Sequence, residues 1–180
     1  MTTFKERPLC SLAFSSEAKS YEENLSALLS LVKKAPSNAL IVFPEVAVTN
    51  FDYDHFEAAA DYAAVITAAL SAAAGERIIA ATMIERGADG RIYNVAKVFH
   101  GGRVIHEQAK AELFKFGGEH DYFAAGDERG IVLFEADGLK IGIITPFGEE
   151  RRNGEQLCLE ENFSEKEVRK MRRYLDVGIV

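Results

Sequence analysis

The 180-residue sequence has no tryptophan and is poor in cysteine, proline and histidine, with 2, 4 and 4 of them respectively. Two cysteines, Cys10 and Cys158, are too few for the disulfide framework that holds small secreted domains together. The four histidines show no paired metal-ligand spacing. We therefore expect free thiols, no metal and no cofactor.

The sequence also lacks a long uninterrupted apolar run. A membrane-spanning helix needs roughly 18 such residues, and the Ala-rich stretch 58–74 is broken by Asp61, which indicates a packed helix instead. Lys5, Glu6 and Arg7 lie where a signal peptide would need apolar residues. We expect a cytoplasmic protein with no membrane partner.

Basic residues are in deficit, with 21 Lys and Arg against 28 Asp and Glu and a formal net charge of −7. This charge argues against a general nucleic-acid binder. A nucleic-acid or membrane surface on the last predicted helix is the competing interpretation, but Glu165 and Glu167 interrupt its charge and favour a solvated helix face. The basic residues of that helix are Lys166, Arg169, Lys170, Arg172 and Arg173.

Hydrophobic residues make up 48% of the chain, enough for one domain, residues 1–180, with a sizeable core. Ser20 and Glu23 form a capping box that begins a helix, and Pro36 ends it. The order is strand, helix, strand, helix and then strands joined by tight turns, which predicts an α/β layered domain with a mixed sheet. The predicted strands are 8–14, 39–43, 77–85, 92–100, 104–110 and a hairpin within 131–145, and the second and last helices are 54–74 and 164–175.

Three charged residues lie after predicted strands or in a loop, where α/β folds commonly place catalytic and binding residues. Glu45 comes directly after a buried apolar strand, Lys110 follows another strand, and Glu119 lies in a loop rich in Gly and Phe. Taken singly, Glu45 reads as a capping or surface acid, Lys110 as a solvated side chain and Glu119 as an ordinary loop acid.

Taken together and in order, the surrounding motifs resemble the nitrilase, or carbon–nitrogen hydrolase, superfamily. The motifs are "LIVFPEVAVTNF" at 40–51, "VAKVFHGGRVI" at 95–105, "EQAKAELF" at 107–114 and "EHDYFAAGD" at 119–127. The resemblance runs from about residue 8 to residue 145. It implies an α-β-β-α sandwich with mixed sheets.

The resemblance also implies a Glu-Lys-Cys mechanism for hydrolysis of a small amide or nitrile. A thiol is mostly protonated at neutral pH and needs a base and a cation beside it to act as a nucleophile. Carried over by motif, Glu45 is the base, Lys110 is the cation beside the developing oxyanion, and Glu119 is the second acid. Members of the superfamily commonly pair, so a homo-oligomer is the partner that the resemblance implies.

The sequence departs from the family at the nucleophile. The family pattern places cysteine four residues after the Gly that corresponds to Gly142, and the residue there is Pro146. "LKIGIIT", 139–145, matches the strand before the nucleophile, whereas "PFGEE", 146–150, matches a segment near the family C-terminus. We expect an internal deletion at this junction, with residues 1–145 as the N-terminal half and 146–180 as the C-terminal segment.

Two alternatives to the deletion remain open: a single substitution at Pro146, and residues missing from the sequence as written. Three other residues could in principle supply a nucleophile. Thr145 is one residue before the cysteine position, so we expect its side chain to point to the opposite face of the strand. Cys158 lies in the late segment, and Cys10 is a small core residue of the first strand.

The departure predicts a sandwich that is incomplete after residue 145 and a chain that is inactive as written. The competing function is a non-catalytic pseudoenzyme, or a truncated product, that keeps the pocket acids and binds a ligand or partner.

Overall fold

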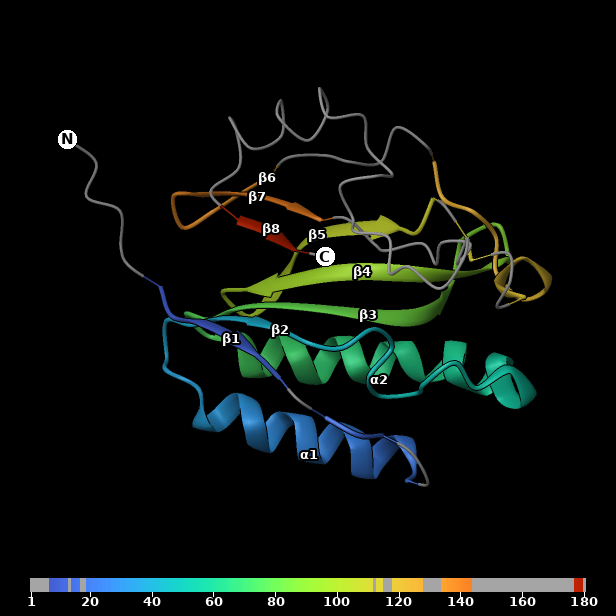
Figure 1. Cartoon of the computed structure of the whole chain (residues 1–180), viewed down its shortest axis with the longest axis horizontal. Coiled ribbons are helices and arrows are strands. Elements are labelled where there is room, and N and C mark those ends of the chain that lie inside the picture. Colours follow the sequence, from blue (N-terminus) through green and yellow to red (C-terminus); the bar gives the residue numbers. More distant parts are fainter. Residues whose placement is uncertain are drawn as a thin grey trace, which may run out of the picture.

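Three layers make up the part of the chain that the computed structural model describes, residues 7–12, 14–16, 19–111, 113–114, 118–127, 134–143 and 177–179 (Figure 1). Two helices lie under a five-stranded sheet, and a three-stranded sheet lies above it. The elements of the helical layer are α1 (Tyr21–Lys34), the 3-10 helix η1 (Tyr53–His55) and α2 (Phe56–Ala74). The larger sheet holds β1 (Leu9–Ser11), β2 (Leu40–Val42), β3 (Ile78–Arg86), β4 (Ile92–His100) and β5 (Arg103–Ala109). The smaller sheet holds β6 (Phe134–Ala136), β7 (Leu139–Ile143) and β8 (Val177–Ile179), and a second 3-10 helix, η3, spans Glu119–Asp121.

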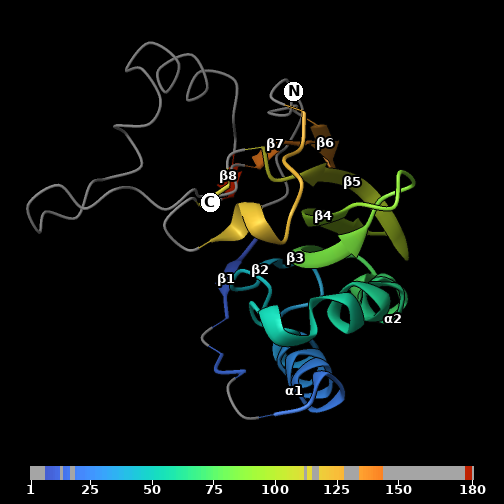
Figure 2. The ribbon, with the colours of Figure 1, turned by 90° about the vertical axis from the view of Figure 1, so that its right-hand side faces the viewer.

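The larger sheet is mixed, as the sequence predicts. Its order is β1-β2-β3-β4-β5. The pairs β1–β2 and β2–β3 are parallel, and the pairs β3–β4 and β4–β5 are antiparallel. Parallel neighbours need crossover connections, which α1 and α2 supply, whereas tight turns suffice for antiparallel neighbours. The two crossovers place both helices on one face of the sheet (Figure 2).

Helix α1 begins and ends where its capping residues predict. The Glu23 backbone N–H donates to Ser20 Oγ at 3.2 Å, and the Ser20 N–H donates to Glu23 Oε2 at 2.9 Å, which confirms the capping box. The helix stops before Pro36, and it buries Leu28 and Val32 in the core under the sheet.

Helix α2 is the Ala-rich helix of the sequence. Within the described ranges, the segment Tyr53–Ala74 has the length and apolar composition of a membrane span, a test that the core helix of a soluble protein also passes. Its buried positions include Ala63, Ile66 and Leu70, which join the same core cluster as Ile79 and Met83 of β3. This packing matches the predicted packed helix.

The second sheet covers the other face of the first. Asp137 and Gly138 turn the hairpin between β6 and β7 with φ of 49° and 81°, as the Asp-Gly pair predicts. Strand β8 lies parallel to β7, with Val177 opposite Ile141. A second core cluster fills the space between the sheets and includes Leu40, Ile78, Val98, Ile141 and Ile143.

These two facing sheets with helices outside one of them confirm the nitrilase-like α/β class. The predicted junction at 145–146 and the predicted last helix lie outside the described residues.

Arg7 ties the two sheets together at one end. Its guanidinium donates to the carbonyl oxygens of Asn38 and Glu76, each at 2.9 Å, and pairs with Asp137 in the β6–β7 turn. The Arg7 side chain is only 4% exposed, so these bonds also compensate for burying its charge.

His106 gives the contact between the sheets a pH dependence. Its ring, on β5, stacks on Phe134 of β6 at 4.3 Å and 10°. Burial lowers the pKa of His106 below its ordinary 6.5, against smaller raising effects of a Gln108 hydrogen bond and the Glu107 charge. The unfolded chain therefore binds the proton more readily than the folded one, so this stabilisation is present above about pH 6.5 and is lost as pH falls below it.

We predict that the free energy of unfolding falls between pH 7.5 and pH 5 by more in the parent protein than in His106→Phe, which keeps the stacked ring but cannot take up a proton. Urea unfolding at the two pH values measures the difference. Equal pH dependence in the two proteins would contradict this role of His106.

Candidate active site

Three separate chain segments bring Glu45, Lys110 and Glu119 into one cluster. Glu45 follows β2, Lys110 follows β5 and Glu119 opens η3. Lys110 Nζ lies 3.1 Å from Glu45 Oε1 and 3.0 Å from Glu119 Oε1. All three sequence-predicted site residues within the described ranges are thus in direct contact.

Burial distinguishes this cluster from surface ion pairs. The side chains of Lys110 and Glu119 are 2% and 3% exposed, so Lys110 is not a solvated lysine and Glu119 is not an ordinary loop acid. Glu45 is 26% exposed and is therefore the member of the cluster that reaches solvent. Buried charges are tolerated only when they are paired and hydrogen-bonded, which fixes the mutual positions of these side chains.

Backbone contacts on both sides hold Lys110 in place. Its N–H donates to the Asn94 carbonyl on β4 at 2.8 Å, and its carbonyl accepts from Gly126 N–H at 2.8 Å. A Cβ at position 126 would lie 2.6 Å from the Ala109 carbonyl oxygen, so only glycine allows this approach. The Gly of the "AAGD" motif therefore lets the loop pack against the end of β5.

Glu119 is oriented by the loop before it. Its Oε2 accepts a hydrogen bond from the Phe114 backbone N–H at 2.8 Å, while its Oε1 accepts from Lys110. Gly118 precedes it with φ of 73°, a conformation that favours glycine. Both carboxylate oxygens of Glu119 are engaged, so this residue orients Lys110.

Asn94 is a fourth member of the cluster, and no sequence motif singled it out. Its side-chain Nδ2 donates to Glu45 Oε1 at 2.8 Å, and the residue is fully buried on β4. Glu45 Oε1 thus accepts from both Asn94 and Lys110, and among the described residues no hydrogen bond occupies Oε2. An Asn in the middle of a predicted apolar strand was the available signal, because Asn is depleted in strands.

Aromatic side chains form one wall beside the carboxylates. Tyr53 of η1 stacks on Tyr122 at 4.3 Å and lies 6.0 Å from Phe123, measured between ring centroids. Burial, followed by the negative charges of Glu119 and Glu45, raises the pKa of Tyr53. Its hydroxyl therefore stays protonated near the cluster and can donate a hydrogen bond.

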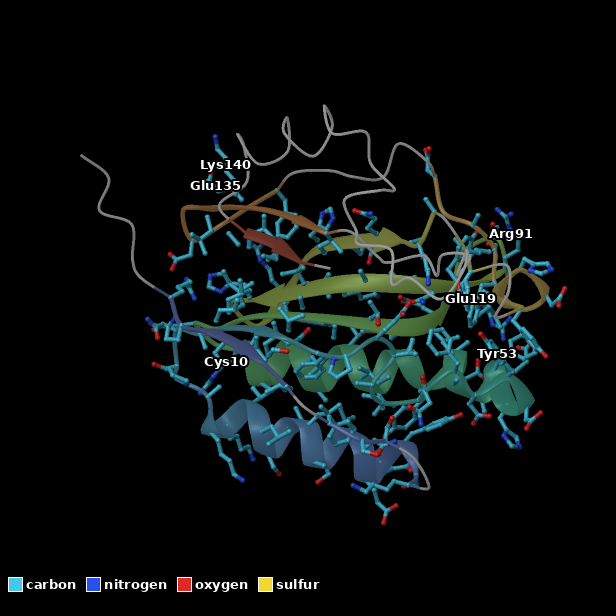
Figure 3. All side chains as sticks on the ribbon, viewed as in Figure 1. Cys10, Tyr53, Arg91, Glu119, Glu135 and Lys140 are labelled. Carbon is cyan, nitrogen blue, oxygen red and sulfur yellow. The ribbon has the colours of Figure 1, made fainter. Side chains whose placement is uncertain are left out.

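Cys10 is too far away to supply a nucleophile to this cluster. It lies on β1 at the opposite end of the molecule from Glu119 and Tyr53 (Figure 3). It is half-buried and packs against the core between the sheet and the helices, as expected of a small core residue. Thr145, Pro146 and Cys158 lie outside the described residues.

No group of three or more His, Cys, Asp or Glu residues suited to a metal ion occurs in the described part of the chain. The cluster's two carboxylates are already occupied by an ammonium group. A carboxylate with one oxygen in contact with an ammonium group has the parts for proton transfer by Glu45 and charge stabilisation by Lys110.

Solved structures share this fold at low sequence identity. A glutamine-dependent NAD+ synthetase from Acinetobacter baumannii is 22% identical with a TM-score of 0.70, covering 94% of this chain and 31% of its own. Nit3 of Saccharomyces cerevisiae, a member of the nitrilase superfamily, is 15% identical with a TM-score of 0.64, covering 94% and 62%. An amidase variant from Nesterenkonia sp., in complex with acrylamide, is 12% identical with a TM-score of 0.67, covering 80% and 57%.

The chain spans less than two thirds of the length of each of these proteins. No curated protein matches it.

The facing sheets and the buried acid–lysine–acid cluster define an α/β protein of nitrilase-like class. Residues 11–173 match the model of the carbon–nitrogen hydrolase family. The chain belongs to the carbon–nitrogen hydrolase family.

We predict that Lys110→Met destabilises the protein by roughly 3–5 kcal/mol, because it leaves Glu119 buried without its counter-charge. Urea unfolding at pH 7 measures the change. The double variant Lys110→Met/Glu119→Gln should recover part of the loss, since it removes the uncompensated charge as well. A Lys110→Met change below about 1 kcal/mol, the range of exposed pairs, would contradict the buried ion pair.

Proposed function

We propose that Glu45, Lys110 and Glu119 form the base, cation and second acid of a site for a small amide or nitrile. The observation that carries the proposal is the position of Lys110 Nζ, 3.1 Å and 3.0 Å from the two carboxylates in a buried setting. Two acids, Glu45 and Glu119, contact this one ammonium group. Lys110 and Asn94 both donate to the same oxygen of Glu45.

The geometry supplies the two groups that attack on an amide or nitrile carbon requires. Glu45 Oε2 is the oxygen left to accept a proton from a nucleophile or a water molecule. Lys110 carries three N–H donors, and two of them are used by the carboxylates among the described residues. The third is available to the substrate oxygen or nitrogen as negative charge develops on it.

Membership in the family and the fold shared with an amidase structure containing acrylamide support an amide as the ligand. The fold is shared equally with an NAD+ synthetase, so the preference for a small amide or nitrile rests on the site.

In amide hydrolysis by the family route, a thiol attacks the carbon and ammonia leaves as the C–N bond breaks, and water then cleaves the thioester to release the acid and the thiol. The chain carries Pro146 where the family pattern places that cysteine, and proline has neither a thiol nor a backbone N–H. The chain as written is therefore expected to bind without turnover. The second candidate function is a non-catalytic protein that binds a ligand or partner, and the proline at position 146 favours it. A cytoplasmic location and homo-oligomer formation remain predictions.

We predict that the 180-residue protein binds acetamide or acrylamide and that Lys110→Met or Glu45→Gln abolishes the binding. Saturation-transfer NMR suits the weak affinity expected of such small ligands. Lys97→Met is the matched control, because Lys97 is also buried and lies 2.7 Å from Glu85 Oε2 but takes no part in the cluster. Lys97→Met should lower stability and keep binding. Loss of binding in folded Lys97→Met, or binding retained in folded Lys110→Met, would contradict the site.

We predict no ammonia release from these amides above the uncatalysed rate. An enzyme-coupled ammonia assay measures it. Release that disappears in Glu45→Ala would overturn the non-catalytic function and establish an active hydrolase.

The variant Pro146→Cys separates a single substitution from an internal deletion. If Pro146 is a point change in an otherwise intact site, the new thiol should restore ammonia release from acetamide. If a block of sequence is missing at this junction, as we expect, Pro146→Cys should stay inactive. Restored turnover would therefore overturn the deletion.

A further inference from the structure

The residue after Glu45 has a backbone conformation that its side chain disfavours. Val46 has φ of 41°, in the left-handed region, where β-branched residues are rare. Its side chain is 1% exposed and packs in a cluster with Ala59, Ile84 and Phe123. Strained backbone of this kind persists only where the surroundings hold it, and it gathers at functional sites.

Hydrogen bonds at both backbone groups hold Val46 in this conformation. Its N–H donates to the Thr82 side-chain Oγ1 on β3 at 2.7 Å. Its carbonyl accepts from Thr49 N–H at 3.1 Å and from Asn50 N–H at 2.8 Å. The second pair of bonds closes the turn itself, whereas the Thr82 bond is the one that fastens the turn to the sheet.

Thr82 and Asn94 hold Glu45 from the same face of the sheet. On the antiparallel pair β3 and β4, Thr82 is opposite Ala96, and Ala96 and Asn94 point to the same side because they are two residues apart. Asn94 contacts the Glu45 carboxylate, and Thr82 contacts the backbone directly after it. The backbone and the side chain of the base are thus fastened to two neighbouring strands.

We propose that Thr82 is a positioning residue that sets the reach of Glu45 to Lys110 by holding Val46 in its left-handed conformation. The proposal rests on the proposed function of Glu45 and deepens it. Without the Thr82 hydroxyl, the Val46 N–H loses its partner and the disfavoured φ can relax. Because Glu45 immediately precedes Val46, its carboxylate then moves relative to the ammonium group of Lys110.

The experiment compares Thr82→Val, which keeps the β-branched shape and removes the hydroxyl, with Thr82→Ser, which keeps the hydroxyl. NMR of the full chain follows the Val46 amide proton and the Lys110 side-chain ammonium resonance. Thr82→Val should shift the Val46 amide proton upfield, move the Lys110 resonance toward its position in Glu45→Gln, and weaken acetamide binding at least tenfold. Thr82→Ser should restore all three.

Thr49→Val is the matched control within the same turn. Thr49 is 3% exposed and its hydroxyl donates to the Asn50 carbonyl at 3.1 Å. Thr49→Val should lower stability and leave the Lys110 resonance in place. If Thr82 had only a structural role, Thr82→Val would give this same result.

An unchanged Lys110 resonance in folded Thr82→Val would overturn the proposal. If Thr82→Val does not fold, amide hydrogen exchange in the parent protein decides, because a Val46 N–H that exchanges as fast as an exposed amide would overturn it too. The NMR signals do not depend on catalysis or ligand. A parent protein that shows them but binds no acetamide would overturn the proposed function and leave the role of Thr82 standing.

Discussion

A buried ammonium group needs anionic partners in fixed positions, and Lys110 imposes this requirement on the centre of the molecule. Removing a lysine ammonium from water costs several kcal/mol unless carboxylates replace the lost hydration. Glu45 and Glu119 meet this need at about 3 Å. The three chain segments that carry Glu45, Lys110 and Glu119 must therefore pack against one another, and the fold brings them together.

The larger sheet provides that means. Strand β2 ends at the turn containing Glu45, and β5 ends at Lys110, whose backbone is bonded to Asn94 on β4. Beyond Glu119, the Gly126 N–H donates to the Lys110 carbonyl and so holds the following loop against the end of β5. The turn after β2 is the least relaxed part of this arrangement, since Val46 takes a conformation that only its packing and its hydrogen bonds maintain.

Glu45, Asn94, Lys110 and Glu119 all lie between positions 45 and 119, and their mutual contacts are made by side chains within that span. Glu45 and Glu119 carry two negative charges against the one positive charge of Lys110, and Asn94 supplies a further hydrogen-bond donor to Glu45.

Local patterns in the sequence determined the elements: the capping box Ser20–Glu23, the Asp137–Gly138 turn and the alternation of apolar segments predicted α1, the β6–β7 hairpin and the mixed sheet. The motifs also singled out Glu45, Lys110 and Glu119 through resemblance. Only the tertiary structure decided that these three touch, and that Asn94 and Thr82 fasten Glu45. These contacts join residues between 9 and 65 positions apart, most of them far beyond the reach of local periodicity. A polar residue on a strand gives no sign of its partner until the register of neighbouring strands brings the two together.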